Sequence, residues 1–334
     1  MSISLKQRCQ NLIVNLGLAK SADVTSVRRM TGGISSDIVI LALPDREICM
    51  KFALAKLRVK ENWEAPVLRN KAEYDWLSFV ANFAPENVPE LLGWSEQDCG
   101  FAMEYISGDD VYLWKDALLQ AKQPRGEAAK VADILGQIHA RSTEAGFNQS
   151  GFQNHGDFHA LRLEPYLRFL ANKHSDISSQ LNSLVDFHFQ SNITLVHGDV
   201  SPKNVLFKAG NPIFLDAECA TMGDPSFDLS FCLHHLILKA LHMPACSQSL
   251  FAEVKAFWQA YAAHITWENP QDLETRVAAL VPALMLARVD GKSPAEYLSE
   301  KTRVKIRTLT IPIIKSPVTS INDVIRAVKN TSET

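Results

Sequence analysis

The spacing of apolar residues predicts a strand-rich segment after a short N-terminal helix. From Leu5 to Leu16 apolar residues recur every three or four positions, which is typical of a helix with one buried face. The next part of the chain changes to short apolar runs that are typical of strands, with a turn signal at Pro44. We expect these runs to form antiparallel strands at residues 25–30, 37–41 and 47–52.

A helix and two further strands complete this segment. Over residues 67–80, after Pro66, apolar and charged residues recur at helical spacing. This pattern predicts a helix of about four turns that crosses the sheet. Strand-like runs follow at 91–94 and 101–105. The expected unit has five strands and one main helix, and it ends at a hinge signal, Ile106-Ser107-Gly108.

Beyond this hinge the pattern is mainly helical. A β-like island at 193–216 interrupts it, and the last few residues, rich in Ser and Thr, are predicted to fray. We therefore expect an α+β fold with an N-terminal lobe at 1–106 and a helical lobe at 107–334. Helices are predicted in this larger lobe at 126–144, 163–190, 226–241, 248–265 and 271–289.

Composition excludes several classes of protein. With 46% hydrophobic and 21% charged residues among 334, the chain is typical of a globular protein. The formal net charge of −3 gives no basic field for nucleic acid or acidic membranes, so neither is an expected partner. The six cysteines show no metal-ligand spacing and are expected to be reduced thiols. Without a leader pattern or a 20-residue apolar run, the expected location is the cytoplasm.

Three oxygen-bearing side chains stand out in the β-like island. The apolar run Ile193 to Val196 leads into His197-Gly198-Asp199, and Asn204 follows five residues after this aspartate. A predicted hairpin with its turn at Gly210-Asn211 then returns Asp216 at the end of a second apolar run. Turn-forming residues are common in loops for conformational reasons alone, but three elements rarely agree in spacing by accident. We expect Asp199, Asn204 and Asp216 to converge.

This set matches the requirements of phosphoryl transfer. The reaction needs Mg²⁺ across the β- and γ-phosphates, an in-line acceptor and a carboxylate at the acceptor hydroxyl. Carboxylate and amide oxygens are suitable ligands for Mg²⁺. One carboxylate as base, with an amide and a second carboxylate as metal ligands, would meet these needs.

The island resembles the signature of the aminoglycoside phosphotransferase and choline kinase superfamily, small-molecule relatives of the protein kinases. The resemblance implies a protein-kinase-like bilobal fold that uses ATP or GTP with Mg²⁺. It implies that Asp199 is the catalytic base and that Asn204 and Asp216 bind the metal. It also implies that Asp228 braces the catalytic loop and that His197 is structural.

A second His-Gly-Asp sequence ends at Asp157 and does not fit the signature. No apolar strand precedes it, and Arg162 stands where the signature requires asparagine. We interpret Asp157 as a loop residue.

The smaller lobe offers candidates for nucleotide binding. Gly32 and Gly33, before Ser35, would let the backbone approach phosphates, although a turn is the simpler explanation. Lys51 lies in an apolar run, and together with Glu73 it resembles the lysine–glutamate pair of kinases. The alternatives to this glutamate are Glu61, Glu64 and Asp75.

The same resemblance predicts the adenine contacts at the hinge. The carbonyl of Glu104 and the N–H of Ile106 would pair with the base edge, which leaves ATP and GTP equally possible. Residues 54–66 are also similar to the corresponding part of methylthioribose kinases.

Two departures from protein kinases favour a small acceptor. Ser201 stands where protein kinases have a lysine, the nearest lysine being Lys203, and no activation segment is evident. The expected acceptor is a hydroxyl of an aminoglycoside, an amino alcohol or a sugar-like metabolite. The alternatives are a nucleotide-binding pseudokinase and a protein-directed kinase, and the oligomeric state stays open. Arg288, Asp290 and Lys292 either face the cleft or form a solvated helix end.

Overall fold

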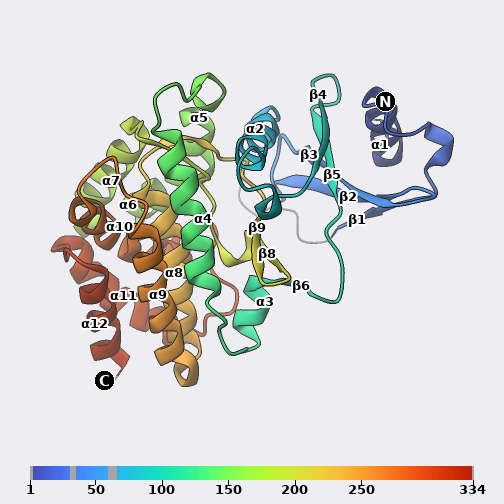
Figure 1. Ribbon diagram of the computed structural model, residues 1–334. Helices are drawn as coiled ribbons and strands as arrows, with labels where there is room; N and C mark the ends of the chain where they lie inside the picture. The colour runs from blue at the N-terminus through green and yellow to red at the C-terminus, as the bar shows by residue number, and fades with distance from the viewer. Residues whose placement is uncertain (1–2, 31–34, 59–65, 333–334) are drawn as a thin grey trace.

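A computed structural model describes residues 3–30, 35–58 and 66–332 of the chain. Figure 1 shows an antiparallel sheet on one side of the molecule and most of the helices on the other. The N-terminus lies beside the sheet and the C-terminus at the far end of the helical part. The α+β organisation predicted from the sequence is confirmed.

The larger sheet has five strands in the order β1-β2-β3-β5-β4, and all neighbours are antiparallel. Each predicted strand is present. Their bounds are β1 Ser26–Arg29, β2 Ser36–Ala42, β3 Glu47–Ala53, β4 Leu91–Ser95 and β5 Gly100–Glu104.

Helices cover both faces of this sheet, which explains why β3 is buried almost throughout. α1 (Leu5–Asn15) packs through Leu12 on the face that carries Met50, and α2 (Arg69–Ala81) packs through Trp76 on the face that carries Cys49. Side chains alternate between the faces of a strand. Lys51, two residues from Cys49, is therefore on the α2 side.

The rest of the chain is mainly helical, around one central helix. α8 runs from Ser226 to His242, and every residue of it as far as Leu241 is buried. It packs between α9 and α10, and α4 packs against α9. The other helices here are α3 Trp114–Leu119, α4 Glu127–Ser142, α5 His155–Phe158, α6 Phe169–Lys173, α7 Ser178–Gln190, α9 Ser247–Ala262, α10 Pro270–Asp290, α11 Glu300–Lys315 and α12 Ile321–Ser332.

Two small sheets hold the predicted β-like island in place. β8 (Val205–Lys208) and β9 (Asn211–Phe214) form the expected hairpin, and β6 (Val111–Leu113) adds a third strand to it. β7 (Thr194–Val196) pairs with β10 (Thr221–Gly223). Residues 197–204, hereafter the β7–β8 loop, connect the two sheets.

Several local predictions were wrong. The helix expected at 163–190 is broken into a π-helical segment, His159–Arg168, followed by α6 and α7, and Pro165 lies inside the first piece. The hairpin turn lies at Ala209-Gly210, both with positive φ, because Asn211 already pairs with Lys208. α11 and α12 were not predicted, and neither were β6 and β10.

Within the described ranges, no helix combines the length and the apolar character needed to cross a bilayer. The boundary between lobes at 106 and 107 stays a prediction.

Candidate functional site

Lys51 is buried between two carboxylates that come from distant parts of the sequence. Its Nζ lies 2.6 Å from Oε2 of Glu73 on α2, and it also contacts Oδ1 of Asp216, just after β9. Lys51 and Glu73 are 2% and 1% exposed, whereas Asp216 is 24% exposed. Of the sequence candidates that the structure describes, Glu73 is thus the partner of Lys51, whereas Glu61 and Glu64 lie outside the described residues. Asp75 on the same helix instead pairs with Lys71.

The backbone at Asp216 has an unusual conformation that directs it toward this pair. Its φ of 68° is in the left-handed region, which non-glycine residues rarely adopt. Its N–H donates to Oε1 of Glu73 at 3.2 Å, so Glu73 binds both Lys51 and the Asp216 backbone. Such strain is found where the surrounding structure enforces it, often at functional sites.

Charge coupling fixes the ionisation of this cluster. Burial raises the pKa of Glu73 to about 7, although the Lys51 ammonium opposes this shift. Burial would also raise the pKa of Asp216, but the attraction of Lys51 and Lys203 outweighs it and holds this pKa below its ordinary value. Asp216 is therefore ionised at neutral pH.

Asp228 organises the start of the β7–β8 loop. Its Oδ2 accepts the N–H of His197 at 2.6 Å, and its Oδ1 accepts the N–H of Gly198 at 2.8 Å. Asp228 lies in the first turn of α8, where a carboxylate also benefits from the helix dipole. It is fully buried, and His139 lies 3.3 Å from it.

His197 is locked as a neutral imidazole. Its Nδ1 accepts the Asp199 N–H at 3.1 Å, and its Nε2 lies 3.1 Å from the carbonyl of Leu215. Because one nitrogen accepts, the other must carry the proton. Burial lowers its pKa, in agreement with the neutral form. The contact with Leu215 links the β7–β8 loop to the residue before Asp216. The ring also packs edge-on against Trp76 of α2.

Asp199 is almost completely buried between two cations. Its Oδ2 lies 2.7 Å from Nη2 of Arg162 and 3.1 Å from Nζ of Lys203. Arg162 is 7% exposed and also donates to the Gly198 carbonyl at 2.7 Å, whereas Lys203 is 49% exposed. Sequence reasoning did not find either contact. In the sequence, Arg162 only distinguishes the second His-Gly-Asp from the family signature.

Asn204 closes the loop and leaves its amide oxygen available. Its side-chain Nδ2 donates to the backbone carbonyl of Asp199 at 3.0 Å, and the backbone carbonyl of Asn204 accepts the Leu215 N–H. Among described residues, nothing donates a hydrogen bond to Oδ1 of Asn204 or Oδ2 of Asp216. Both are hard oxygens of the kind that Mg²⁺ binds, so the donor set fits this ion.

No group of three or more His, Cys, Asp or Glu side chains forms a metal site in the described part of the chain. A metal here would be held by one carboxylate, one amide and ligands from a nucleotide, the usual arrangement for Mg²⁺ in kinases.

The remaining nucleotide candidates are placed less completely. Gly32 and Gly33 lie outside the described residues. The carbonyl of Ser35 accepts hydrogen bonds from Arg69 at 2.5 Å and from the Leu54 N–H at 2.8 Å. The backbone of Ser35 is therefore held in place directly before β2.

At the predicted hinge, Glu104 is the last residue of β5, and its side chain pairs with Lys208 at 3.3 Å. Ile106 is buried, and its N–H meets no protein acceptor within the described segments. This donor is free for a ligand.

Arg69 is a structural residue of the site that the sequence did not reveal. It is buried on α2 and pairs with Glu218 at 3.0 Å, while its guanidinium also binds the carbonyls of Ser35, Leu54 and Pro66. It thereby ties α2 to the segment after Asp216. Buried arginines can satisfy several acceptors at once because their donors form a planar fork.

The three residues considered for the cleft are separated. Arg288 lines a small pocket beside the β7–β8 loop. Asp290 pairs with Arg307 at 2.9 Å and with His174 at 3.1 Å, and Lys292 lies 3.8 Å from Glu164. Neither lines that pocket.

The expectation that the second His-Gly-Asp sequence forms a loop was wrong, because it is helical. Asp157 belongs to the short helix α5 and is half-buried. Burial raises its pKa, and the nearby Glu218 adds to this effect although Arg69 opposes it.

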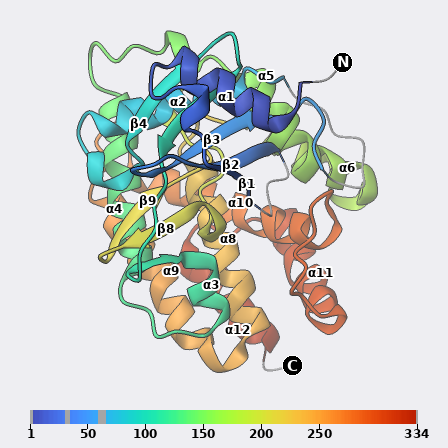
Figure 2. The same cartoon turned by 90° about the vertical axis from the view of Figure 1, so that its right-hand side faces the viewer.

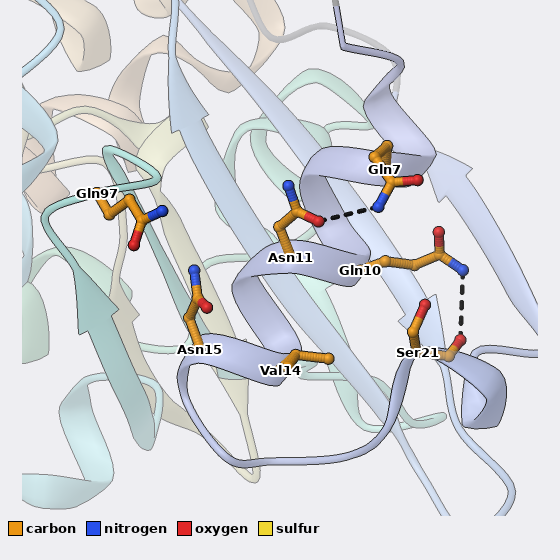
Figure 3. A pocket seen from close by; sticks show the side chains of 7 residues that line it. All are labelled: Gln7, Gln10, Asn11, Val14, Asn15, Ser21 and Gln97. Carbon is orange, nitrogen blue, oxygen red and sulfur yellow. Dashed lines mark hydrogen bonds between the residues drawn. The ribbon is translucent and has the colours of Figure 1, made fainter.

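A larger pocket of about 350 Å³ lies between α1 and the β4–β5 turn. Figure 3 shows the side chains that line it. Its side chains are uncharged and mainly amides, such as Gln7, Asn11 and Gln97. None of its lining residues belongs to the cluster around Lys51 and Asp199. Its lining therefore offers no acid and no base for catalysis.

The profile of the phosphotransferase enzyme family, APH, matches residues 26–274. The chain belongs to this family. The match covers the sheet, the β7–β8 loop and most of the helical part. It confirms the family expected from the sequence, and with it the prediction of an enzyme of the small-molecule kinase type.

Several solved structures have the same protein-kinase-like fold as this chain, although their sequence identity to it is low. An amicoumacin kinase in complex with AMP-PNP, Ca²⁺ and Ami is 13% identical, with a TM-score of 0.58 and coverage of 92% of this chain and 95% of the other. A choline/ethanolamine kinase family protein from Mesorhizobium loti is 14% identical, with a TM-score of 0.51 and coverage of 98% and 95%. A spectinomycin phosphotransferase with ADP and spectinomycin is 12% identical, with a TM-score of 0.51 and coverage of 97% and 98%. No curated protein sequence matches.

Proposed function

We propose that this phosphotransferase moves the γ-phosphoryl group of ATP or GTP to a hydroxyl of a small molecule, with Asp199 as the catalytic base. The observation that carries the proposal is the buried cluster in which Lys51, Glu73 and Asp216 meet. Lys203 connects this cluster to Asp199, since it lies 3.1 Å from that carboxylate and also lowers the pKa of Asp216.

Each residue has a defined task in this proposal. Lys51, oriented by Glu73, would bind the α- and β-phosphates. Asn204 and Asp216 would hold Mg²⁺, which when bound neutralises charge on the β- and γ-phosphates. Asp199 would accept the proton of the acceptor hydroxyl. The hydroxyl oxygen of the acceptor would then bond to the γ-phosphorus while the bond from this phosphorus to the leaving nucleoside diphosphate breaks.

The nucleotide would lie against the sheet. The free N–H of Ile106 and the carbonyl of Glu104 are suited to the base edge, and the amicoumacin kinase, which shares the fold, was solved with AMP-PNP. We assign residues 1–106 to the nucleotide lobe and 107–334 to the lobe that binds the acceptor. Gly32, Gly33 and Ser35 stay candidates for the phosphate loop.

The test is a transfer assay with γ-labelled ATP or GTP and Mg²⁺. The panel contains aminoglycosides, amino alcohols, sugars, sugar phosphates and a generic protein. Label in a small molecule is expected. Label in the protein alone would replace the proposal with a protein-directed kinase. Nucleotide binding without any transfer would indicate a pseudokinase.

A further inference from the structure

A small pocket opens beside the β7–β8 loop on the side of the helices. Its lining comes from the loop itself, α3, α8, the end of α10 and the segment after α10. Figure 2 shows α3 lying below the β8–β9 hairpin, close to this loop. The charged side chains in the lining are Lys115, Lys203, Lys239, Arg288 and Glu296. Four cations thus face one carboxylate.

Lys239 is the most unusual of these side chains. It is 1% exposed, in the central helix α8. Across the described residues, no carboxylate lies within 4 Å of its Nζ. Its hydrogen bond is a long one of 3.5 Å to the carbonyl of His235, and its ammonium lies 5.3 Å from the ring of Tyr297. A buried ammonium without a counterion is costly, so a protein rarely retains one without a use.

Arg288 adds a second cation without a counterion. Its Nη1 donates to the hydroxyls of Ser293 at 2.8 Å and Tyr166 at 3.4 Å, both neutral groups. Its Nε is buried and has no acceptor in the described structure. Asp290, one half-turn away, is committed to Arg307. The guanidinium therefore keeps its full charge toward the pocket.

The electrostatic balance of the pocket agrees with these contacts. Burial, together with repulsion from Lys115 and Arg288, lowers the pKa of Lys239 to about 7. Glu296 is 70% exposed and pairs with Lys115 at 3.0 Å. Its attraction also acts on Lys239, but it is weaker there than burial and the repulsion of the neighbouring cations. His235 and the Tyr297 hydroxyl are neutral groups of the lining.

We propose that this pocket binds an oxyanion of the acceptor substrate, a phosphate or a carboxylate, through Lys239 and Arg288. The inference rests on the proposed function and narrows its substrate class to anionic hydroxyl compounds. It disfavours amino alcohols and aminoglycosides, whose ammonium groups would be repelled by Lys239 and Arg288.

Lys203 connects this pocket with the reacting group. Its side chain lines the pocket, and its ammonium lies 3.1 Å from Oδ2 of Asp199. An acceptor held by Lys239 and Arg288 would extend along Lys203 and bring a hydroxyl to Asp199. The reaction is then balanced: the hydroxyl loses its proton to Asp199, its oxygen bonds to the γ-phosphorus, and the nucleoside diphosphate departs.

The pocket is separate from the expected nucleotide site. Lys51, the cation for the nucleotide phosphates, lies on β3, whereas no lining residue of the pocket belongs to the five-stranded sheet. An anion in the pocket should therefore bind together with AMP-PNP and not compete with it.

A calorimetric titration tests the binding step with defined probes. D-ribose 5-phosphate and D-glycerate represent the two oxyanions, and D-ribose, glycerol and choline are the neutral and cationic controls. Binding of at least one anionic probe in the presence of Mg²⁺ and AMP-PNP is expected, with an affinity at least about tenfold above that of its neutral counterpart. The stronger of the two anionic probes identifies the type of oxyanion. Equal binding of charged and neutral probes would overturn the inference.

Matched variants locate the binding. Lys239→Met and Arg288→Gln should each lower the affinity for the anionic probe about 10- to 100-fold, because a charge-assisted contact is lost. The control is Lys255→Met, an exposed lysine of α9, which should change nothing. Lys239→Met should also unfold at the same or a higher temperature, since it removes an uncompensated buried charge. Lower stability with unchanged anion binding would make Lys239 a structural residue.

The transfer assay separates this inference from the proposed function. Turnover of neutral or cationic acceptors that depends on Asp199, without turnover of anionic ones, would leave the function intact and overturn the anionic acceptor. Anion binding that requires Lys239, without transfer to any acceptor, would support the pocket and contradict the kinase mechanism.

Discussion

Nη2 of Arg162 lies 2.7 Å from Oδ2 of Asp199, and both side chains are buried. The arginine comes from a π-helical segment and the aspartate from the β7–β8 loop, 37 residues later in the chain. Arg162 also donates to the backbone carbonyl of Gly198. It therefore holds the backbone of the loop as well as the side chain of Asp199. The candidate base is thus positioned by a residue outside the family signature.

Replacing Arg162 should reduce turnover more than substrate binding. Arg162→Met is expected to lower kcat about 10- to 100-fold, because small displacements of a catalytic group are costly, while the KM for nucleotide changes little. Arg162→Lys should restore part of kcat. The control is Arg168→Met in the same segment, whose partner Asp186 is exposed. A uniform rise in KM with an unchanged kcat would contradict the positioning role.

Glu73 should be needed for nucleotide use, and Asp75 should not. Glu73→Gln keeps an acceptor for the Asp216 N–H but removes the charge that orients Lys51. We expect kcat/KM for ATP to fall at least about tenfold, corresponding to the loss of one charge-assisted contact. Asp75→Asn, on the same helix, should stay within about twofold of the wild type. A larger loss of kcat/KM in Asp75→Asn than in Glu73→Gln would contradict the assignment of Glu73 to the nucleotide site.

Gly198 is required by the geometry of the β7–β8 loop. Its φ is +78°, and a Cβ there would lie 2.7 Å from Cβ and 2.9 Å from the carbonyl oxygen of Cys219. Gly198→Ala should lower the free energy of unfolding by about 2 kcal/mol or more. Gly156, the glycine of the second His-Gly-Asp sequence, has open space at this position, so Gly156→Ala should be tolerated. Chemical denaturation of the two variants measures the difference.

Anion binding in the pocket should weaken as the pH rises above 7. Lys239, with a pKa of about 7 in the free protein, must be protonated to bind an oxyanion, and the bound anion raises this pKa. Affinity should be constant below pH 7 and fall by up to about tenfold per pH unit above it. The other groups facing Lys239 are Lys115, Lys203, His235, Arg288, Glu296 and Tyr297.

Calorimetry with D-glycerate between pH 6 and 9 measures this dependence. Glycerate is preferred because its carboxylate does not titrate in this range. Lys239→Met should abolish the slope along with most of the affinity. A slope that persists in this variant would assign the titration to another group.

The sequence predicted those site residues that local spacing determines. Asp199 and Asn204 lie in the β7–β8 loop and Asp216 shortly follows the β8–β9 hairpin, so their approach follows from short-range geometry. For Lys51, the apolar run alone allowed either solvent or a buried anion, and the resemblance of Lys51 and Glu73 to the lysine–glutamate pair of kinases favoured the second. Five strands and most helices followed from periodicity in the same way.

Long-range contacts could not be predicted in this way. Arg162 reaches Asp199 only because the π-helical segment packs on the β7–β8 loop, and nothing in the local sequence reports this packing. Lys239 lies in a helix that is buried on all sides, so periodicity could not distinguish a buried lysine from one at a solvated end. The sequence does carry a signal for α12, since Ile321, Val324, Ile325 and Val328 recur at helical spacing and are buried.

The identity of the base is tested most directly by Asp199→Asn. With the best acceptor from the panel, we measure kcat together with the Kd of Mg²⁺–AMP-PNP for the wild type and this variant. The account predicts that kcat falls about 10²- to 10⁴-fold while the Kd stays within about threefold, because the amide cannot accept the hydroxyl proton but the nucleotide site is unchanged. A kcat within tenfold of the wild type would contradict it.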